Sequence, residues 1–314
     1  MEIPYAVSFQ NTTISNIPES NKEELNNHNH EEADTLMILH AIDVASCNPF
    51  RKVIVCSLDT DVFLLLIHHY ESLSAETHFL TGFGDRKRII SVGDAFNSLP
   101  KHRQSLLGFH AFTSCDTTSK FAGKTKLTCW RTLMKADQSV IRAFEKLGDE
   151  EIMWEEVSTG LEWFVCSLFS NSKVPAGQQE LAKVRWRIFS TTQNADKLPP
   201  TCGALKYKIL RSHLATSIWK DAYKAKTREL DPVDYGWYSN DDGKMMPKTT
   251  DESPAPESVI ELCVCSCTSG CNTNLCTCRR NRMWCTDMCQ CIECGNDDGN
   301  DAKPVWEEDE ESTD

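Results

Sequence analysis

The sequence predicts an α/β protein with a parallel sheet and a helical extension, followed by a small cysteine-rich module. Two observations predict this fold class. The continuous apolar run at 52–57, KVIVCS, lies between two helix-like segments, which is typical of a parallel strand covered on both faces. Ten of the sixteen cysteines lie between positions 263 and 294, in a segment too short to bury a core of its own.

The overall composition is that of a soluble globular protein. The 314 residues are 40% hydrophobic and 25% charged, which is enough for one sizeable domain plus an appendage. The net charge of −13 argues against a protein that simply coats nucleic acid. No apolar run approaches the roughly 20 residues of a membrane helix, and no signal peptide opens the chain. We therefore expect an intracellular protein with no membrane partner and with its scattered cysteines reduced.

Shifts in composition divide the chain into five parts. Residues 1–27 are polar and lack a convincing period, so we expect a loose lead-in before an α/β domain at 28–240. Proline, serine and charged residues at 241–260 predict a linker. The cysteine module covers 261–296, and the acidic tail at 297–314 is expected to be disordered and solvated, with an interaction role left open.

The first half of the α/β domain alternates helix and strand. Acidic residues open a helix at 31–47, and the segment after the apolar strand predicts a second helix at 59–69. Alternating residues at 77–83 and 87–92 flank GDRK and predict either a hairpin or two edge strands. Helical periods then continue to the end of the domain, at about 93–99, 101–112, 126–136, 139–147, 155–169 and 201–226.

The cysteine spacing of the module predicts bound zinc. Thiolates one to three residues apart can wrap a tetrahedral Zn²⁺ ion. A disulfide knot is the alternative, but a disulfide across one residue would be strained, and Cys-x-Cys pairs recur here. The candidate ligands are Cys263, Cys265, Cys267, Cys271, Cys276, Cys278, Cys285, Cys289, Cys291 and Cys294.

Residues 265–296 resemble the tesmin-type cysteine-rich domain, or CXC domain, a chromatin module. The most specific part is the run CTCRRNRMWCTDMCQCIECGN at 276–296. The resemblance implies about three zinc ions held by shared cysteines, and a surface that touches DNA. The front of the module departs from the family, because one residue fewer separates Cys267 from Cys271 and Cys263 is an extra candidate ligand.

The charges of the module are compatible with two kinds of partner, DNA and protein. Arg279, Arg280 and Arg282 lie close together and could make a small phosphate or minor-groove contact. They are balanced by an equal number of acids within 261–296, so any contact with DNA is local. The alternative is a zinc knot that binds a protein partner or stabilises the end of the chain.

Five acids of the α/β domain suggest a second metal site. Two open the first helix, two follow the apolar strand and one stands in FTSCDTTS; they are Glu32, Asp34, Asp59, Asp61 and Asp116. Ligands collect at the carboxyl ends of parallel strands, and clustered carboxylates favour Mg²⁺ or Mn²⁺. Each acid taken singly also has an ordinary explanation, as a helix-start, N-cap or turn residue.

The order of these acids resembles the flap endonuclease and XPG branch of the PIN-like nucleases. EAD at 32–34, DTD at 59–61 and SCD at 114–116 are similar to three successive motifs of that family. The resemblance implies a PIN-like three-layer fold, two-metal hydrolysis with the five acids as ligands, and a DNA-clasping turn. Candidate DNA contacts in FAGKTKLTCWRTL are Lys124, Lys126 and Arg131, although an exposed helix face explains the lysines equally well.

The chain also departs from this second family. Residues 1–27 contain no aspartate, so the acids that the family draws from earlier elements are missing. This predicts a truncated gene product or a domesticated mobile-element protein with a decayed site. His110 and Cys115 lack an orienting partner, so we expect a buried structural cysteine there and no thiol nucleophile.

Two functional hypotheses follow. In the first, a transposon-derived, nuclease-like protein binds DNA and cleaves it with Mg²⁺ or Mn²⁺, in the nucleus in preference to the cytoplasm. In the second, the PIN-like fold is a catalytically inactive scaffold, and the zinc module of this adaptor binds protein or chromatin.

Overall fold

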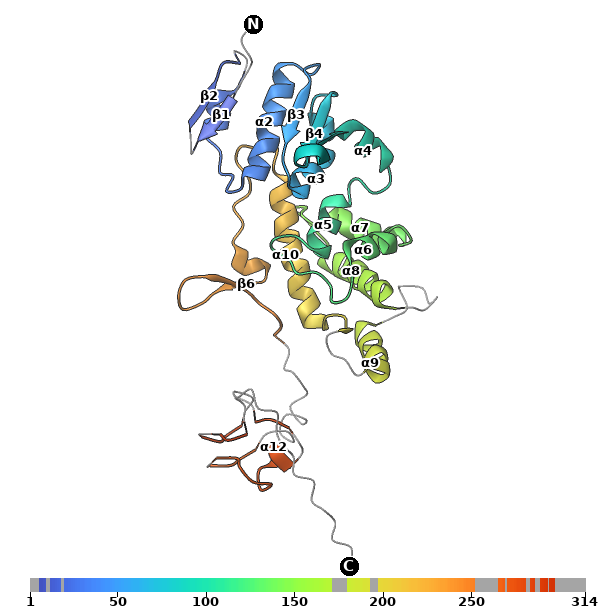
Figure 1. Ribbon diagram of the computed structural model, residues 1–314, viewed down its shortest axis with the longest axis vertical. Helices are drawn as coiled ribbons and strands as arrows, with labels where there is room; N and C mark the ends of the chain where they lie inside the picture. Colours follow the sequence, from blue (N-terminus) through green and yellow to red (C-terminus); the bar gives the residue numbers. More distant parts are fainter. Residues whose placement is uncertain are drawn as a thin grey trace, which may run out of the picture. The chain divides into compact units, whose positions relative to one another are not determined.

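The chain forms two units: residues 1–250, which we call the body, and residues 251–314, which contain the cysteine module. The body is a mixed α/β structure, and Figure 1 shows a small sheet with a few helices beside it, while the other helices form a group next to this part. The computed structural model describes residues 6–9, 12–17, 20–170, 180–192, 197–251, 265–268, 270–280, 283–285, 289–292 and 294–296.

The central sheet of the body has one parallel and one antiparallel pair. Its strands are β3 (Val53–Cys56), β4 (Thr77–Thr81) and β5 (Arg88–Ser91), in that order. β3 runs parallel to β4, and β4 and β5 form the antiparallel hairpin. The predicted parallel pair and the hairpin alternative are confirmed. The prediction that β3 is covered on both faces is wrong, because Val55 is buried whereas Ile54 is 44% exposed.

Helices α2 (Ala33–Cys47), α3 (Thr60–His68) and α4 (Val92–Ser98) share one apolar core with the sheet. Two short 3₁₀ turns precede and follow β4 along the chain, η1 (Tyr70–Ser72) and η2 (Gly84–Arg86). Leu66 of α3 and Phe79 of β4 are both buried in this core. The continuous apolar run at 62–67 supplies all of the buried side chains of α3. This core therefore fixes the starts of α2 and α3 relative to the carboxyl end of β3.

A second core joins the helices that follow. Phe112, Phe144 and Phe164 are fully buried and meet edge to face, a geometry that aromatic rings favour. Gly108 allows the close approach of two of these helices, since a Cβ there would lie 2.2 Å from the carbonyl oxygen of Phe144. The helices are α5 (Leu106–Thr113), α6 (Lys126–Leu133), α7 (Gln138–Lys146), α8 (Trp154–Phe169) and α9 (Leu181–Thr192).

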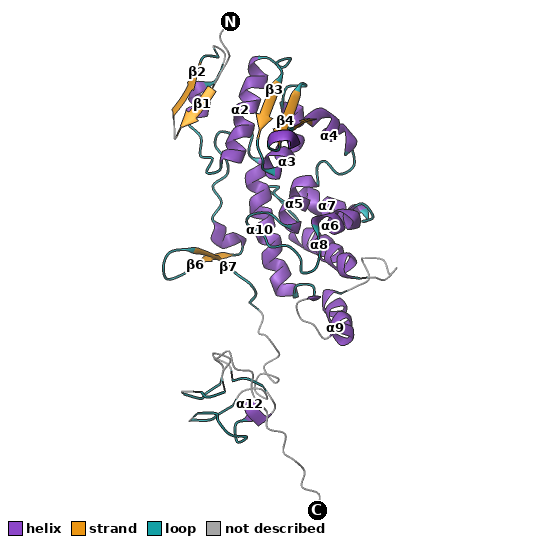
Figure 2. Ribbon diagram, viewed as in Figure 1, coloured by secondary structure: helices purple, strands orange, loops and turns teal. Residues whose placement is uncertain are grey.

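Helix α10 (Cys202–Lys220) contributes to both cores. Leu205 and Ile209 near its start are buried among the helices, whereas Ala215 and Trp219 near its end are buried with α2, α3 and the sheet. Figure 2 shows α10 running along the helical part of the body. The helix ends six residues earlier than the predicted 201–226, and α5 starts five residues later than the predicted 101–112.

The segment before residue 28 differs from the expected loose lead-in. It contains the hairpin of β1 (Ala6–Phe9) and β2 (Thr12–Ser15) and the short helix α1 (Lys22–Asn26). Leu25 of α1 is fully buried beside Leu39. Elements this short contain too few residues to establish a period in the sequence.

The end of the body and the start of the linker also differ from expectation. The 3₁₀ turn η5 (Pro232–Tyr235) leads to a hairpin of β6 (Trp237–Ser239) and β7 (Met245–Pro247), so regular structure extends into the predicted linker 241–260. Residues 252–260 of that linker and the acidic tail lie outside the described residues. Among the helices that the structure describes, none is long and apolar enough to cross a membrane.

Candidate metal centres

The five predicted acids are held by the starts of two helices and by one turn. Glu32 is the N-cap residue of α2, and Asp34 lies in its first turn. Asp59 is the N-cap of α3, and its side chain accepts a hydrogen bond from the backbone N–H of Asp61 at 2.9 Å. Asp116 follows α5. The partial positive charge of a helix N-terminus favours the carboxylates at these starts.

A tight turn carries Asp116. The backbone N–H of Cys115 donates to the carbonyl of Thr118 at 3.3 Å, and the N–H of Thr118 donates back at 3.2 Å. The Cys115 thiol lies 3.3 Å from the Thr118 hydroxyl. Lys208 of α10 donates to the carbonyl of the next residue, Ser119, and so ties the turn to the helix.

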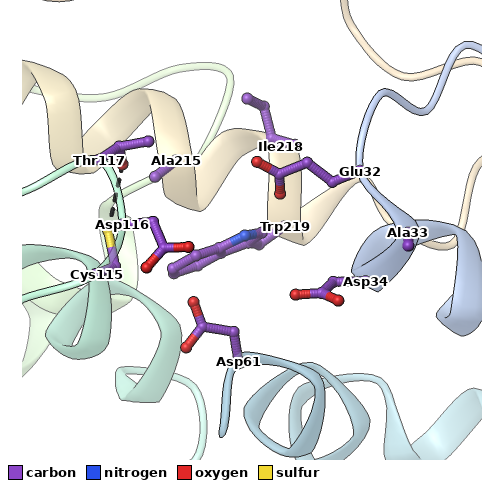
Figure 3. A pocket seen from close by; sticks show the side chains of 10 residues that line it. All are labelled: Glu32, Ala33, Asp34, Asp61, Cys115, Asp116, Thr117, Ala215, Ile218 and Trp219. Atoms are coloured by element: carbon purple, nitrogen blue, oxygen red, sulfur yellow. Dashed lines mark hydrogen bonds between the residues drawn. The ribbon is translucent and has the colours of Figure 1, made fainter. Parts of the chain in front are cut away.

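Four of the acids line one cavity of about 300 Å³, which we call the acid cavity. Figure 3 shows the carboxyl groups of Glu32, Asp34, Asp61 and Asp116 around the indole of Trp219. Because the acids come from separate segments of the chain, the fold brings them together.

A second cavity of about 590 Å³ adjoins the first and shares Asp61, Cys115 and Asp116 with it. We call it the side cavity. Asp59 lines it, so all five predicted acids lie on one or both cavities. Its other wall consists of Leu64, Leu106, Phe109, Leu127 and Trp130.

The acids of the two cavities act on one another electrostatically. Burial raises the pKa of Glu32, and the negative charges of Asp34, Asp116 and Asp61 raise it further. Burial also raises the pKa of Asp34, with the charges of Asp59, Asp61 and Asp116 acting in the same direction. Carboxylates in this situation are stabilised by a proton or by a nearby cation.

His110 is a further part of this site, and the sequence analysis did not find its role. Its ring is buried, and Nε2 lies 2.7 Å from Asp61 Oδ1. Lys126 Nζ lies 3.3 Å from the same Nε2 and donates to the carbonyl oxygen of Ser114 at 2.6 Å. Burial lowers the pKa of Lys126, and the charge of Asp61 opposes that shift. The only cue in the sequence was a histidine on the apolar helix that precedes Asp116.

The other basic residues predicted near this site differ in their surroundings. Lys124 lies in the loop before α6, with Nζ 4.6 Å from the ring centre of Phe169, and burial lowers its pKa. Arg131 is exposed on α6. Neither lines the acid cavity or the side cavity, whereas Lys126 lines the side cavity.

The cysteine module holds its sulfur atoms at the spacing of a metal–thiolate site. The Sγ atoms of Cys265 and Cys271 are 3.6 Å apart, and those of Cys265 and Cys285 are 3.8 Å apart. The Cys276–Cys285 pair is also at 3.6 Å. A tetrahedral zinc site with Zn–S bonds of about 2.3 Å has sulfur atoms about 3.8 Å apart. A disulfide bond is only about 2 Å long, and none of the described cysteines forms a disulfide.

The nine described cysteines of the module form four overlapping groups. In each group of four, the Sγ atoms lie within 4.8 Å of one another. Cys265 and Cys285 each belong to three of the groups. Within the described residues, no three carboxylates have oxygen atoms that all lie within 4.8 Å of one another. The cysteine cluster is therefore ready to bind metal with shared ligands, whereas the acids are further apart.

The surroundings of the thiols depend on backbone and side-chain donors. Burial raises the pKa of Cys276, but the hydrogen bond from the N–H of Arg279 and those with the neighbouring cysteine thiols together outweigh it, so the pKa is lowered to about 7. Burial and the Cys289 thiol raise the pKa of Cys278 to about 12. Asn296 is buried and donates through Nδ2 to Cys285 Sγ at 3.4 Å. Such N–H···S bonds favour thiolates, the form that binds metal.

The arginines of the module lie partly outside the described residues. Arg279 and Arg280 belong to the short helix α12 (Thr277–Arg280), where Arg280 is exposed. Arg282 and the extra candidate ligand Cys263 lie outside the described residues.

Trp219 is the second feature that the sequence did not predict. It comes from the far end of α10, and its carbonyl oxygen lies 2.9 Å from His69 Nε2. No motif spacing connects it to the acids, because only the packing of α10 brings it to the cavity. An aromatic residue in a helical pattern is normally read as part of a core.

Comparison of the chain with protein-family models, with curated proteins and with solved structures finds no match. The resemblances to PIN-like nucleases and to tesmin-type domains therefore stay predictions. The protein is a mixed α/β body followed by a cysteine-rich C-terminal cluster that has the geometry to bind metal.

Proposed function

We propose that the protein acts on DNA, with a Mg²⁺- or Mn²⁺-dependent phosphodiesterase site in the body and a zinc-binding module that contacts DNA or chromatin. One observation carries the proposal. Acids from the starts of α2 and α3 and from the turn after α5 converge on two adjoining cavities, where burial and the neighbouring negative charges raise the pKa of Glu32 and Asp34. Asp34 and Asp61 are half-buried and the other three acids are exposed, and several like charges gathered at one place repel one another unless a cation neutralises them.

The chemistry we propose is hydrolysis of a phosphodiester. Two divalent ions held by these acids would supply an activated water and stabilise the leaving oxygen. The water would form a new P–O bond as the bond to the leaving oxygen breaks; one proton of the water would pass to solvent, and the leaving oxygen would take a proton from solvent. Glu32, Asp34, Asp61 and Asp116 would act as metal ligands, and Asp59 as a ligand from the side cavity. His110 would hold Asp61 in position through their 2.7 Å contact.

In the module, we propose about three zinc ions. Three tetrahedral ions need twelve sulfur positions, so nine cysteines suffice when three of them bridge two ions. The repeated membership of Cys265 and Cys285 in the ligand groups supports such bridging. A role on DNA would place the protein in the nucleus. We further propose that the chain derives from a mobile element.

A specific observation supports the alternative of a catalytically inactive adaptor. The carboxylate oxygens of the described acids do not come within 4.8 Å of one another as a group of three. An ion would have to draw them together. If it does not, the body is a scaffold and the module is the binding unit.

Cleavage of labelled DNA separates the two proposals. Flap, nicked and single-stranded DNA are incubated in Mn²⁺ with the parent protein, with the double variant Asp61→Asn/Asp116→Asn, and with Asp85→Asn, an exposed acid that lines neither cavity. We expect cleavage by the parent and by Asp85→Asn, and a loss of at least about 100-fold in the double variant. Binding of DNA without cleavage by any of the three would establish the adaptor.

A further inference from the structure

Strand β3 leaves one edge of the central sheet open. It is an outer strand, because the strand order is β3-β4-β5. The backbone N–H groups of Val53 and Ser57 donate to carbonyl oxygens on the β4 side, at 3.2 Å each. Successive residues of a strand direct their backbone groups to alternate sides, so Ile54 and Cys56 direct theirs to the open edge. Within the described part of the chain, no strand pairs with β3 at this edge.

A groove of about 710 Å³ follows the open edge. Residues 51–56 all line it, together with apolar side chains of α2 that include Leu36, Met37 and Val44. These three side chains are half-buried, and Ile54 is 44% exposed. A strand edge with free backbone groups beside an apolar groove is a template for the addition of a further strand.

The two ends of β3 carry opposite charges. Arg51 and Lys52 precede the strand, whereas Asp59 and Asp61 follow it. A parallel neighbour with the same sequence would place like charges side by side, which is unfavourable. An antiparallel neighbour with the same sequence places each basic end beside an acidic end. The edge of β3 is therefore complementary in charge to a second copy of itself that runs in the opposite direction.

We propose that the protein forms a two-fold symmetric dimer in which β3 pairs antiparallel with β3 of a second copy. In the register that we propose, Ile54 lies opposite Cys56 of the partner subunit. Each such pair exchanges two backbone hydrogen bonds, and the two-fold axis passes between the two copies of Val55. The same register sets Arg51 opposite Asp59 of the partner subunit. This interface goes beyond the proposed function and does not depend on it.

Sedimentation equilibrium of the full-length protein, at about 1 to 100 µM, measures the dimerisation constant. Ile54→Lys places a charge at the paired edge, a substitution that opposes strand addition. Ile89→Lys is the matched control, because Ile89 lies on β5, the other outer strand of the same sheet, and is 58% exposed. We expect Ile54→Lys to weaken dimerisation by at least about 10-fold and Ile89→Lys to leave it unchanged. Circular dichroism shows whether both variants fold.

Ile54→Cys tests the register directly. The Cα atoms of an antiparallel hydrogen-bonded pair lie about 5.5 Å apart, a separation that a disulfide can bridge. Cys56 is exposed, so oxidised glutathione should join the new thiol to Cys56 of the partner subunit and give a covalent dimer. Ile54→Cys/Cys56→Ser is the control, in which this cross-link should be lost. Peptide mass spectrometry identifies the two residues that are joined.

The outcomes decide between this dimer and other occupants of the groove. A parent that stays monomeric at every concentration overturns the inference and leaves the proposed function standing; a strand of another protein would then be the occupant. A dimer that Ile54→Lys retains, or that Ile89→Lys weakens equally, also overturns it, since the interface would lie elsewhere. If Ile54→Lys does not fold, the cross-link decides, and a dimer of Ile54→Cys without a bond between positions 54 and 56 refutes the pairing.

Discussion

The body and the cysteine module both bring together side chains that can bind metal, but they hold them in opposite ways. In the body, a core that includes Phe112, Phe144 and Phe164 contains none of the acids. The acids lie at helix starts and in a turn. In the module, the buried core consists of the cysteines themselves. The body therefore has an apolar core that does not depend on a metal ion. The described part of the module has no core apart from its cysteines, so we expect its fold to depend on the bound metal.

Removal of zinc is the largest expected perturbation, and it should affect only one unit. Structural zinc contributes about 10–16 kcal/mol to the folding of comparable small modules. We expect a strong chelator to abolish dispersed NMR signals from the module while the melting temperature of the body stays the same. Cys285→Ser should also lose zinc, because Cys285 belongs to three ligand groups.

Cys202→Ser is the matched control for that experiment. Cys202 is exposed in the body and belongs to none of the ligand groups, so its loss should leave the zinc content unchanged. Metal analysis shows when all the zinc has been removed. A module that stays folded at that point would contradict the expectation that metal holds it together.

The converse perturbation is in the core of the body. Phe144→Ala removes a fully buried ring that contacts Phe109, Phe112 and Phe164. We expect a loss of about 3–5 kcal/mol in the free energy of unfolding, measured in urea. Zinc content should be unaffected. Met153→Ala, at an exposed site, should change stability by less than about 0.5 kcal/mol.

A smaller effect is expected from the repulsion between the acids. The pKa of Asp34 is raised in the folded protein, so the folded state binds its proton more readily than the unfolded state does. Stability contributed by the protonated form is therefore lost as pH rises through the raised pKa. Without metal, Asp34→Asn should be more stable than the parent above this window, by at most about 1 kcal/mol because Asp34 is partly hydrated.

The pH dependence makes the Asp34→Asn prediction specific. The stability difference should vanish below about pH 4, where the carboxyl is protonated in both states. Thermal scans against pH measure it, and Asp85→Asn, an exposed acid outside the cluster, should show no such trend. A parent that is more stable than Asp34→Asn at neutral pH without metal would mean that Asp34 already has a cationic partner.

The smallest expected effect tests which unit contacts DNA phosphate. Arg280→Gln on α12 should weaken DNA binding uniformly across sequences and reduce the slope of log affinity against log salt by about 1. Arg131→Gln provides the comparison in the body, since Arg131 is exposed on α6. A change of slope for Arg131→Gln alone would assign the contact to the body.

The sequence predicted best where a local pattern decides the structure. The apolar run of β3, the alternating hairpin of β4 and β5, and the periods of α7 and α8 all appear as elements in the structure. Short elements such as α1 were missed because four or five residues do not establish a period. Helix α9 was also missed, since its apolar residues alternate with basic ones.

The candidate sites divide in the same way. The acids were found because four of them lie at the start of a helix and Asp116 lies shortly after the end of one, where local sequence indicates their places. His110, Trp219 and Trp130 were not assigned to the site, because they reach it through packing between distant segments. The cysteines could be predicted as metal ligands without knowledge of the packing, because their spacing along the sequence is enough to place them around one ion.

Helix α10 has a consequence for how this protein could change over time. Because one continuous helix supplies Leu205 to the helical core and Trp219 to the acid cavity, the two halves of the body cannot be exchanged or lost separately. Insertions before α10, on either side of α9 in the sequence, leave that connection intact. Natural variation in length should therefore accumulate before residue 201, whereas the spacing between Leu205 and Trp219 should stay constant among relatives of this chain.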